Sequence, residues 1–189
     1  MQQAKIHRVP AALFALAICV SSAWAQAQGD TLQKIKETGT LTLGYRESSV
    51  PFSFLDAQQK PVGFSLDLCA AIADQIKRQL GMSALTIKQV AVNSSNRIPL
   101  VVNGTVDIEC GGTANNLARQ KQVSFSVATF AGQPRWLARA DAGLKQPADL
   151  KGKTVVVTQG SNAVGFVRRI NENDKLGLNV IQALSLIHI

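Results

Sequence analysis

The chain has 189 residues, 46% of them hydrophobic and 17% charged, a balance typical of a globular protein of one domain or slightly more. Its formal net charge is +8, but the basic residues are scattered and no basic helix or row of aromatic residues accompanies them, which argues against nucleic-acid binding. With two histidines, His7 and His188, the chain has little material for a catalytic Ser-His or Cys-His pair, which argues against a hydrolase.

Residues 1–25 have the pattern of a secretory signal peptide. Lys5 and Arg8 form a basic start, an apolar run follows, and the tripeptide AWA, which ends at Ala25, is a small-x-small cleavage site. The apolar run is too short for a membrane span. Loss of Lys5 and Arg8 with this segment lowers the formal net charge from +8 to +6. We therefore expect an exported mature protein that begins near Gln26.

The next segment begins with a predicted helix and strand. A capped helix is expected from Asp30 to a stop at Gly39, followed by a strand of alternating pattern that ends in Arg46. Residues 51–64 indicate a hairpin around the turn AQQ, or a pair of short extended segments. A second helix is predicted from Asp67 to Gly81, because apolar residues recur every four positions, at Leu68, Ile72, Ile76 and Leu80.

A strand over 84–92 leads to a short helix over 94–104, in which Pro99 is tolerated only in the first turn. Arg97 then shares that turn, where a cation faces the positive end of the helix dipole and is disfavoured by about 0.3–1 kcal/mol. Two interpretations stay open at this point. Arg97 is either a solvated surface residue or part of a site in which a guanidinium and backbone N–H groups hold an anion together.

The order of elements predicts an α/β fold with a mostly parallel sheet. A strand over 105–110 runs into the loop GGTANN and a short helix over 117–122. Ligands of such sheets bind beyond the carboxyl ends of the strands. Arg46, the segment 93–97 and the loop 111–116 all follow strands, so we expect them to converge at one edge.

A second unit is predicted after a boundary at Gln133 and Pro134. It contains a buried strand over 154–158, the turn QGSN, and a helix whose apolar positions include Val164, Val167 and Ile170. A further strand is expected over 176–183. The sequence GSNAVG is not the dinucleotide-binding fingerprint, and no Walker-type lysine motif is present.

The cysteines that follow the predicted signal peptide are Cys69 and Cys110. Export permits a disulfide, but two cysteines distant in sequence do not establish one, so their pairing stays open. The sequence has no C-x-x-C motif and no Cys/His cluster, so we expect neither a metal site nor a thioredoxin-type centre.

Three stretches together closely resemble the periplasmic solute-binding proteins of polar amino-acid ABC transporters: GYRESSVPFSFLDAQQKPVGFSLDL, NSSNRIPLVVNGTVDIECGGTANNLARQKQVSFS and DLKGKTVVVTQGS. The resemblance covers about residues 31–182, and within the family it is strongest to members that bind glutamate and aspartate. It implies two α/β lobes joined by extended hinge strands that close on the ligand. It also implies a periplasmic monomer without a cofactor that delivers its ligand to an inner-membrane permease. The first lobe would span 26–132 and the second 133–189.

The resemblance also implies a set of binding residues. Arg97 would hold the ligand α-carboxylate with backbone N–H groups near Gly112 and Thr113, and Arg46 would meet the side-chain carboxylate and so select acidic amino acids. Ser94 and Thr113 would add hydroxyl hydrogen bonds. In the second lobe, the resemblance assigns backbone and hydroxyl contacts to Gly160 and Ser161.

The chain departs from the family pattern in two places. Gly112 stands where this branch of the family usually has Ser, which removes one hydroxyl. The family's second lobe also continues well beyond residue 189, and the aspartate that receives the ligand ammonium and a specificity histidine lie in that later part. His188 does not replace this histidine, because its surroundings, SLIHI, do not resemble the family.

Two alternatives to a binding protein follow. One is an enzyme on the same fold, which needs an acid in the cleft. The available carboxylates are Glu47, more typical of a surface or hinge-supporting position, and Glu109, more typical of a paired strand residue. The other alternative is that the 189-residue chain is a fragment that binds no glutamate at micromolar concentration and is poorly stable, because its second lobe stops within the sheet.

Overall fold

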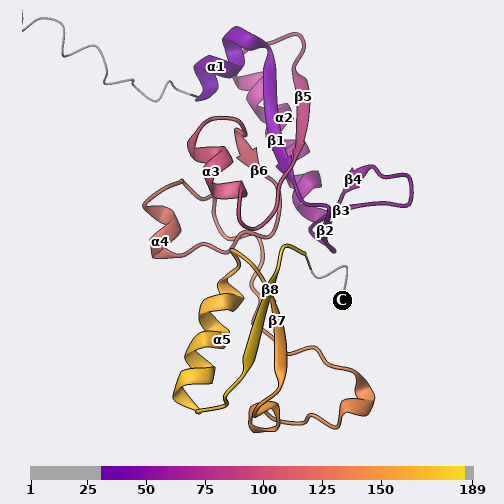
Figure 1. Cartoon of the computed structure of the whole chain (residues 1–189). Coiled ribbons are helices and arrows are strands. Elements are labelled where there is room, and N and C mark those ends of the chain that lie inside the picture. The colour runs from indigo at the N-terminus through magenta and orange to yellow at the C-terminus, as the bar shows by residue number, and fades with distance from the viewer. Residues whose placement is uncertain (1–30, 186–189) are drawn as a thin grey trace, which may run out of the picture.

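The computed structural model describes residues 31–185 of the chain. The predicted signal peptide with its cleavage site, Asp30 and His188 lie outside the described residues. Figure 1 shows two parts, one above the other, that meet at a narrow waist. Divided at the predicted boundary, residues 31–132 hold one hydrophobic cluster and residues 133–185 hold another, which we call the first and second lobes. Among residues 31–185, no helix is long and apolar enough to cross a lipid bilayer.

The first lobe is built on a parallel sheet. Its order is β5 (Thr86–Ala91), β1 (Thr40–Tyr45), β6 (Ile108–Glu109), and both pairs are parallel, as the alternation of elements predicts. The helices of this lobe are α1 (Thr31–Thr38), α2 (Phe64–Gln79), α3 (Arg97–Val102) and α4 (Leu117–Gln120). Because β1, β5 and β6 run side by side in one direction, their carboxyl ends all face the waist (Figure 1).

The predicted hairpin is present as a small antiparallel sheet. Its strands are β2 (Ser48–Ser49), β3 (Ser53–Leu55) and β4 (Pro61–Val62). The hydroxyl of Ser53, which is fully buried, accepts a hydrogen bond from the backbone N–H of Arg46 over 2.8 Å. The hairpin therefore fixes the backbone of Arg46 directly after the central strand β1.

The predicted alternation of the first strand was wrong, and the helix α2 begins earlier than its spacing predicts. The strand β1 does not alternate, since its residues 41–44 are all buried, as expected for the central strand of a parallel sheet covered on both faces. Helix α2 begins at Phe64 rather than Asp67, and it turns Leu66, Cys69 and Ala73 to the core. Of the apolar residues whose spacing predicts this helix, Ile76 and Leu80 pack against the core, whereas Ile72 is 41% exposed.

A disulfide between Cys69 and Cys110 answers the question that the sequence left open. Cys69 lies on α2 and Cys110 directly follows β6, and both belong to the hydrophobic cluster of the first lobe. The bond therefore ties the end of β6, where the loop GGTANN begins, to the helix that packs on the sheet.

The second lobe contains a pair of parallel strands and one long helix. The strands are β7 (Thr154–Thr158) and β8 (Asn179–Ala183), and the helix α5 (Asn162–Asn173) lies between them in sequence and beside them in space (Figure 1). Val167 is buried and Val164 and Ile170 are partly buried, as predicted. The strand predicted over 154–158 is present with these bounds, but its predicted burial was wrong, because Val157 alone is fully buried. Two short 3₁₀ turns, Ala140–Ala142 and Pro147–Leu150, precede β7.

Candidate functional site

A cleft of about 460 Å³ lies at the waist, within the range of about 300–1,000 Å³ that is usual for small-molecule sites. Residues of both lobes line it, and most are polar. From the first lobe come Arg46, Ser48, Ser49, Ser94, Arg97, Gly112, Ala114 and Arg119, and from the second lobe Thr158, Ser161, Asn162 and Ser185. The cleft thus lies at the carboxyl ends of the first lobe's strands, where the sequence places a ligand.

Arg97 is the first residue of α3, as the position of Pro99 predicts. The side chain of Asn93 accepts hydrogen bonds from the backbone N–H groups of Ser95 and Asn96, which shapes the turn that precedes the helix. Arg97 is 3% exposed, so the interpretation of a solvated surface arginine was wrong. The pKa of Arg97 is lowered to about 10, chiefly by burial; Glu109 opposes this shift, and the charges of Arg119 and Arg46 add to it.

Three arginines gather at this cleft around one carboxylate. Desolvation by burial also lowers the pKa of Arg46 and of Arg119, and Glu109 opposes the shift in both. Glu109 Oε1 lies 3.8 Å from Arg97 Nη1. Three guanidinium groups against one carboxylate leave two positive charges in excess, and partial burial strengthens their attraction for an anion.

Arg119 is a cleft residue that sequence analysis assigned to a helix but not to the site. It lies on α4, whose N-cap residue Asn116 accepts a hydrogen bond from the backbone N–H of Arg119 over 2.9 Å. Asn162 and the serines Ser48, Ser49 and Ser185 were missed as well. The one available signal for Arg119 was its position on the segment that directly follows the loop GGTANN.

The other predicted residues divide between the cleft and its margins. Ser94 and Gly112 line the cleft, whereas Thr113 lines a separate cavity behind the loop, where its hydroxyl oxygen is buried without a hydrogen-bond partner. Ser161 lines the cleft, and its hydroxyl donates a hydrogen bond to the Thr158 carbonyl oxygen over 2.6 Å. Gly160 lies against the first lobe, so that a β-carbon there would be 2.6 Å from the carbonyl oxygen of Ser94.

Between residues that the structure describes, hydrogen bonds join the two lobes beside the cleft. Arg119 Nη2 donates to the Gly160 carbonyl oxygen over 3.1 Å, and Ser95 Oγ donates to the Gln159 carbonyl oxygen over 3.4 Å. The side chains of Asn116 and Asn162 are 3.2 Å apart, and the hydroxyls of Ser48 and Ser185 are 2.9 Å apart. The structure is therefore in a closed arrangement, with both lobes in contact around the site.

Comparison with known proteins agrees with this architecture. Residues 41–185 match the family described as bacterial extracellular solute-binding proteins, family 3. The L-glutamate/L-aspartate-binding protein of Pseudomonas aeruginosa is 48% identical over 154 residues, which cover 81% of this chain and 51% of that protein. The glutamate/aspartate import solute-binding protein of Escherichia coli is 44% identical over 183 residues, which cover 95% of this chain and 61% of that protein. This chain thus spans about half to three-fifths of the length of these relatives.

Solved structures give the same result for the fold. An ancestral arginine-binding protein bound to arginine matches with a TM-score of 0.63 and 28% identity over 79% of this chain and 63% of its own. The arginine-bound, truncated ArgBP of T. maritima matches with a TM-score of 0.65 and 27% identity over 82% of this chain and 69% of its own. The match to the family over residues 41–185 and the two-lobed fold with a cleft at the waist lead to one conclusion: this chain belongs to the bacterial extracellular solute-binding proteins of family 3.

Proposed function

We propose that the cleft binds an amino acid with two carboxylates, glutamate or aspartate, and that the protein is the periplasmic component of an ABC transporter. In this role the protein would act as a monomer and pass its ligand to an inner-membrane permease without changing it chemically. The observation that carries the proposal is the excess of two positive charges, from Arg46, Arg97 and Arg119 against Glu109, in a cleft between two lobes.

The positions of the arginines suit the two carboxylates of such a ligand. Arg97 is held by its place at the start of α3, and Arg46 by the hydrogen bond between its backbone and Ser53. A guanidinium can bind a carboxylate through two parallel hydrogen bonds, and burial strengthens this interaction. We assign the α-carboxylate to Arg97 and the side-chain carboxylate to Arg46, with Ser94 as a further hydrogen-bonding group.

The names of the relatives support an acidic ligand. The proteins of Pseudomonas aeruginosa and Escherichia coli are named for glutamate and aspartate, at 48% and 44% identity, whereas a glutamine-binding protein of Geobacillus stearothermophilus is 31% identical. The arginine-bound structural neighbours share the fold at 27–28% identity. An arginine ligand would place a fourth guanidinium beside the three of the cleft, and the repulsion between like charges disfavours this arrangement.

The proposal includes no catalytic step, although one structural neighbour is described as a precursor of cyclohexadienyl dehydratase. Glu47 is exposed. Glu109 has a side chain that is 12% exposed, and its charge acts on the three arginines. This arrangement supports a role for Glu109 in charge balance rather than in proton transfer.

Titration of the 189-residue chain with glutamate, aspartate, glutamine and arginine, followed by amide NMR spectra, tests the proposal. NMR detects binding at millimolar as well as micromolar concentration. We expect glutamate and aspartate to shift the amides of Gly112, Ser94 and Ser161, and arginine to leave them unchanged. A preference for arginine or glutamine would contradict the acidic ligand. Absence of binding to all four would favour the alternative of a binding-incompetent fragment.

A further inference from the structure

Glu109 lies at the carboxyl end of β6, where its charge acts on all three arginines of the cleft. Among the described residues it is the carboxylate that pairs with Arg97, over 3.8 Å between Oε1 and Nη1. The paired side chains are 4% exposed for Arg97 and 12% exposed for Glu109. A carboxylate so shielded from water affects its neighbours far more than one on the surface.

The contact between Glu109 and Arg97 is one of charge rather than of hydrogen bonding. Glu109 Oε1 and Arg97 Nε are both buried, and neither has a hydrogen-bond partner in the described part of the chain. Buried polar atoms are nearly always hydrogen-bonded in folded proteins, so two such atoms in one cluster need a reason. A cluster that is completed by a ligand provides one.

The chain makes room for this carboxylate with a glycine. A β-carbon at Gly111 would collide with Glu109 Oε1 and lie 2.9 Å from Arg46 Cγ. The loop after β6 can therefore cover both side chains only because residue 111 has none. Glu109 lines the cavity behind this loop, and Gly112 of the same loop lines both that cavity and the cleft.

The charge of Glu109 has different effects in the empty and in the occupied cleft. When the cleft is empty, Glu109 is the charge that offsets the mutual repulsion and the desolvation of Arg46, Arg97 and Arg119. When a ligand is bound, its carboxylates face the arginines, while an ammonium on the same ligand is attracted by Glu109. A dicarboxylate without an ammonium gains nothing from Glu109 and is repelled by it.

We propose that Glu109 is a specificity-determining residue, which stabilises the arginine cluster in the empty cleft and favours a dicarboxylate with an ammonium over one without. Glu109 acts through charge and through the position of Arg97, without touching the ligand. The identity of the ligand rests on the proposed function, whereas the stabilisation of the empty cluster does not.

Thermal melting at low ionic strength tests the stabilisation without any amino acid. We expect Glu109→Gln to lower the melting temperature, and Glu47→Gln, which removes the same charge from an exposed position, to leave it unchanged. Sulfate should raise the melting temperature of Glu109→Gln more than that of the wild type, because an added anion replaces the lost carboxylate. If Glu109→Gln melts like Glu47→Gln, the proposal is wrong.

A second variant separates charge balance from a steric role. Adding Arg119→Gln to Glu109→Gln returns the excess to two positive charges, so the double variant should recover part of the lost stability. The single variant Arg119→Gln completes the double-mutant cycle, because it measures the loss of stability that comes from the missing hydrogen bonds of Arg119 alone. If Glu109→Gln does not fold in low salt, sulfate or Arg119→Gln should restore folding. Failure of both to improve the stability of Glu109→Gln would overturn the proposal.

The selectivity is tested by NMR titration with glutamate and with glutarate, which lacks the ammonium. We expect Glu109→Gln to shift the affinity ratio toward glutarate by about tenfold, and Glu109→Asp, which keeps the charge, to retain the wild-type ratio. An unchanged ratio in Glu109→Gln would contradict the role in specificity. If the wild-type chain binds neither ligand, the proposed function fails, and the melting experiments still decide whether Glu109 balances the cluster.

Discussion

Arg119 connects the two lobes: its Nη2 donates a hydrogen bond to the Gly160 carbonyl oxygen over 3.1 Å. Its Nη1 donates to the Ala114 carbonyl oxygen of its own lobe over 2.8 Å. One guanidinium thus fixes the distance between the loop after β6 and the turn after β7, and it also lines the cleft. Arg119 therefore couples the closed arrangement of the lobes to the charge of the site.

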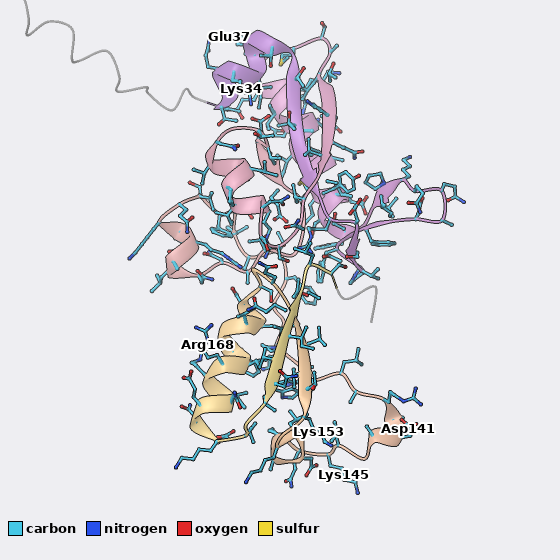
Figure 2. All side chains as sticks on the ribbon, in the orientation of Figure 1. Lys34, Glu37, Asp141, Lys145, Lys153 and Arg168 are labelled. Carbon is cyan, nitrogen blue, oxygen red and sulfur yellow. A yellow bond between two sulfur atoms is a disulfide. The ribbon has the colours of Figure 1, made fainter. Side chains whose placement is uncertain are left out.

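Replacement of Arg119 by Gln should favour an open arrangement of the lobes. The variant loses a charge-assisted hydrogen bond between the lobes. Hydrogen bonds of this kind typically contribute about 1.5–3 kcal/mol to stability. We expect a larger radius of gyration in small-angle X-ray scattering of the ligand-free chain. Arg168→Gln is the control, because Arg168 lies on the outer side of α5 away from the waist (Figure 2). Equal radii for the two variants would show that Arg119 does not hold the lobes together.

Gly160 should tolerate no side chain, for two separate reasons. Its φ is +72°, and a β-carbon would lie 2.6 Å from the Ser94 carbonyl oxygen and 2.9 Å from Ser95 Cα in the other lobe. Gly152 has a similar φ of +70° but nothing within 4 Å of a β-carbon, so Gly152→Ala carries the backbone strain alone.

Both alanine variants should therefore lose about 1 kcal/mol of stability, measured by urea unfolding, from the positive φ. Gly160→Ala should in addition separate the lobes. Energy transfer between two dyes measures that separation, with the dyes attached to cysteines introduced by Lys36→Cys and Arg168→Cys at these exposed positions. If both variants give the same transfer efficiency as the wild type, the close contact between Gly160 and Ser94 does not limit closure.

The sequence predicts the element order, the parallel sheet and the meeting of Arg46, Ser94 and Arg97, because these follow from local patterns and from the geometry of parallel strands. It does not predict that β1 is buried on both faces or that Ile72 is exposed. These depend on which elements cover the sheet and the helix. Apolar residues spaced four apart are compatible with more than one buried face of a helix. In α2 the buried face is the one that carries Leu66, Cys69 and Ala73, which belong to the core.

Within the site, the positions of Arg119 and Thr113 could not be predicted from the sequence either. Helix α4 has four residues, too few for a periodic pattern that would indicate which side of it faces the cleft. Thr113 lines the cavity behind the loop but not the cleft, whereas its neighbour Gly112 lines both. The side on which each residue lies follows from the fold of the loop.

The disulfide between Cys69 and Cys110 should contribute strongly to the stability of the first lobe. Its cysteines are 41 residues apart, and the entropy of closing such a loop in the unfolded chain corresponds to about 4 kcal/mol. We expect Cys69→Ser with Cys110→Ser to lower the free energy of unfolding in urea by about this amount. Reducing agent should have the same effect on the wild type and none on the double variant. A loss below about 1 kcal/mol would contradict this prediction.

The affinities of the wild type, Arg97→Ala and Arg46→Ala for glutamate and glutamine test the central claim most directly. Both ligands have an α-carboxylate, so Arg97→Ala should weaken both, by about 2–5 kcal/mol. Glutamine lacks the second carboxylate, so Arg46→Ala should weaken glutamate and spare glutamine, while Arg168→Gln should change neither. Amide NMR titrations of the four proteins measure this. Equal losses of glutamate and glutamine binding in Arg46→Ala, or unchanged binding in Arg97→Ala, would contradict the assignment of the two arginines to the two carboxylates.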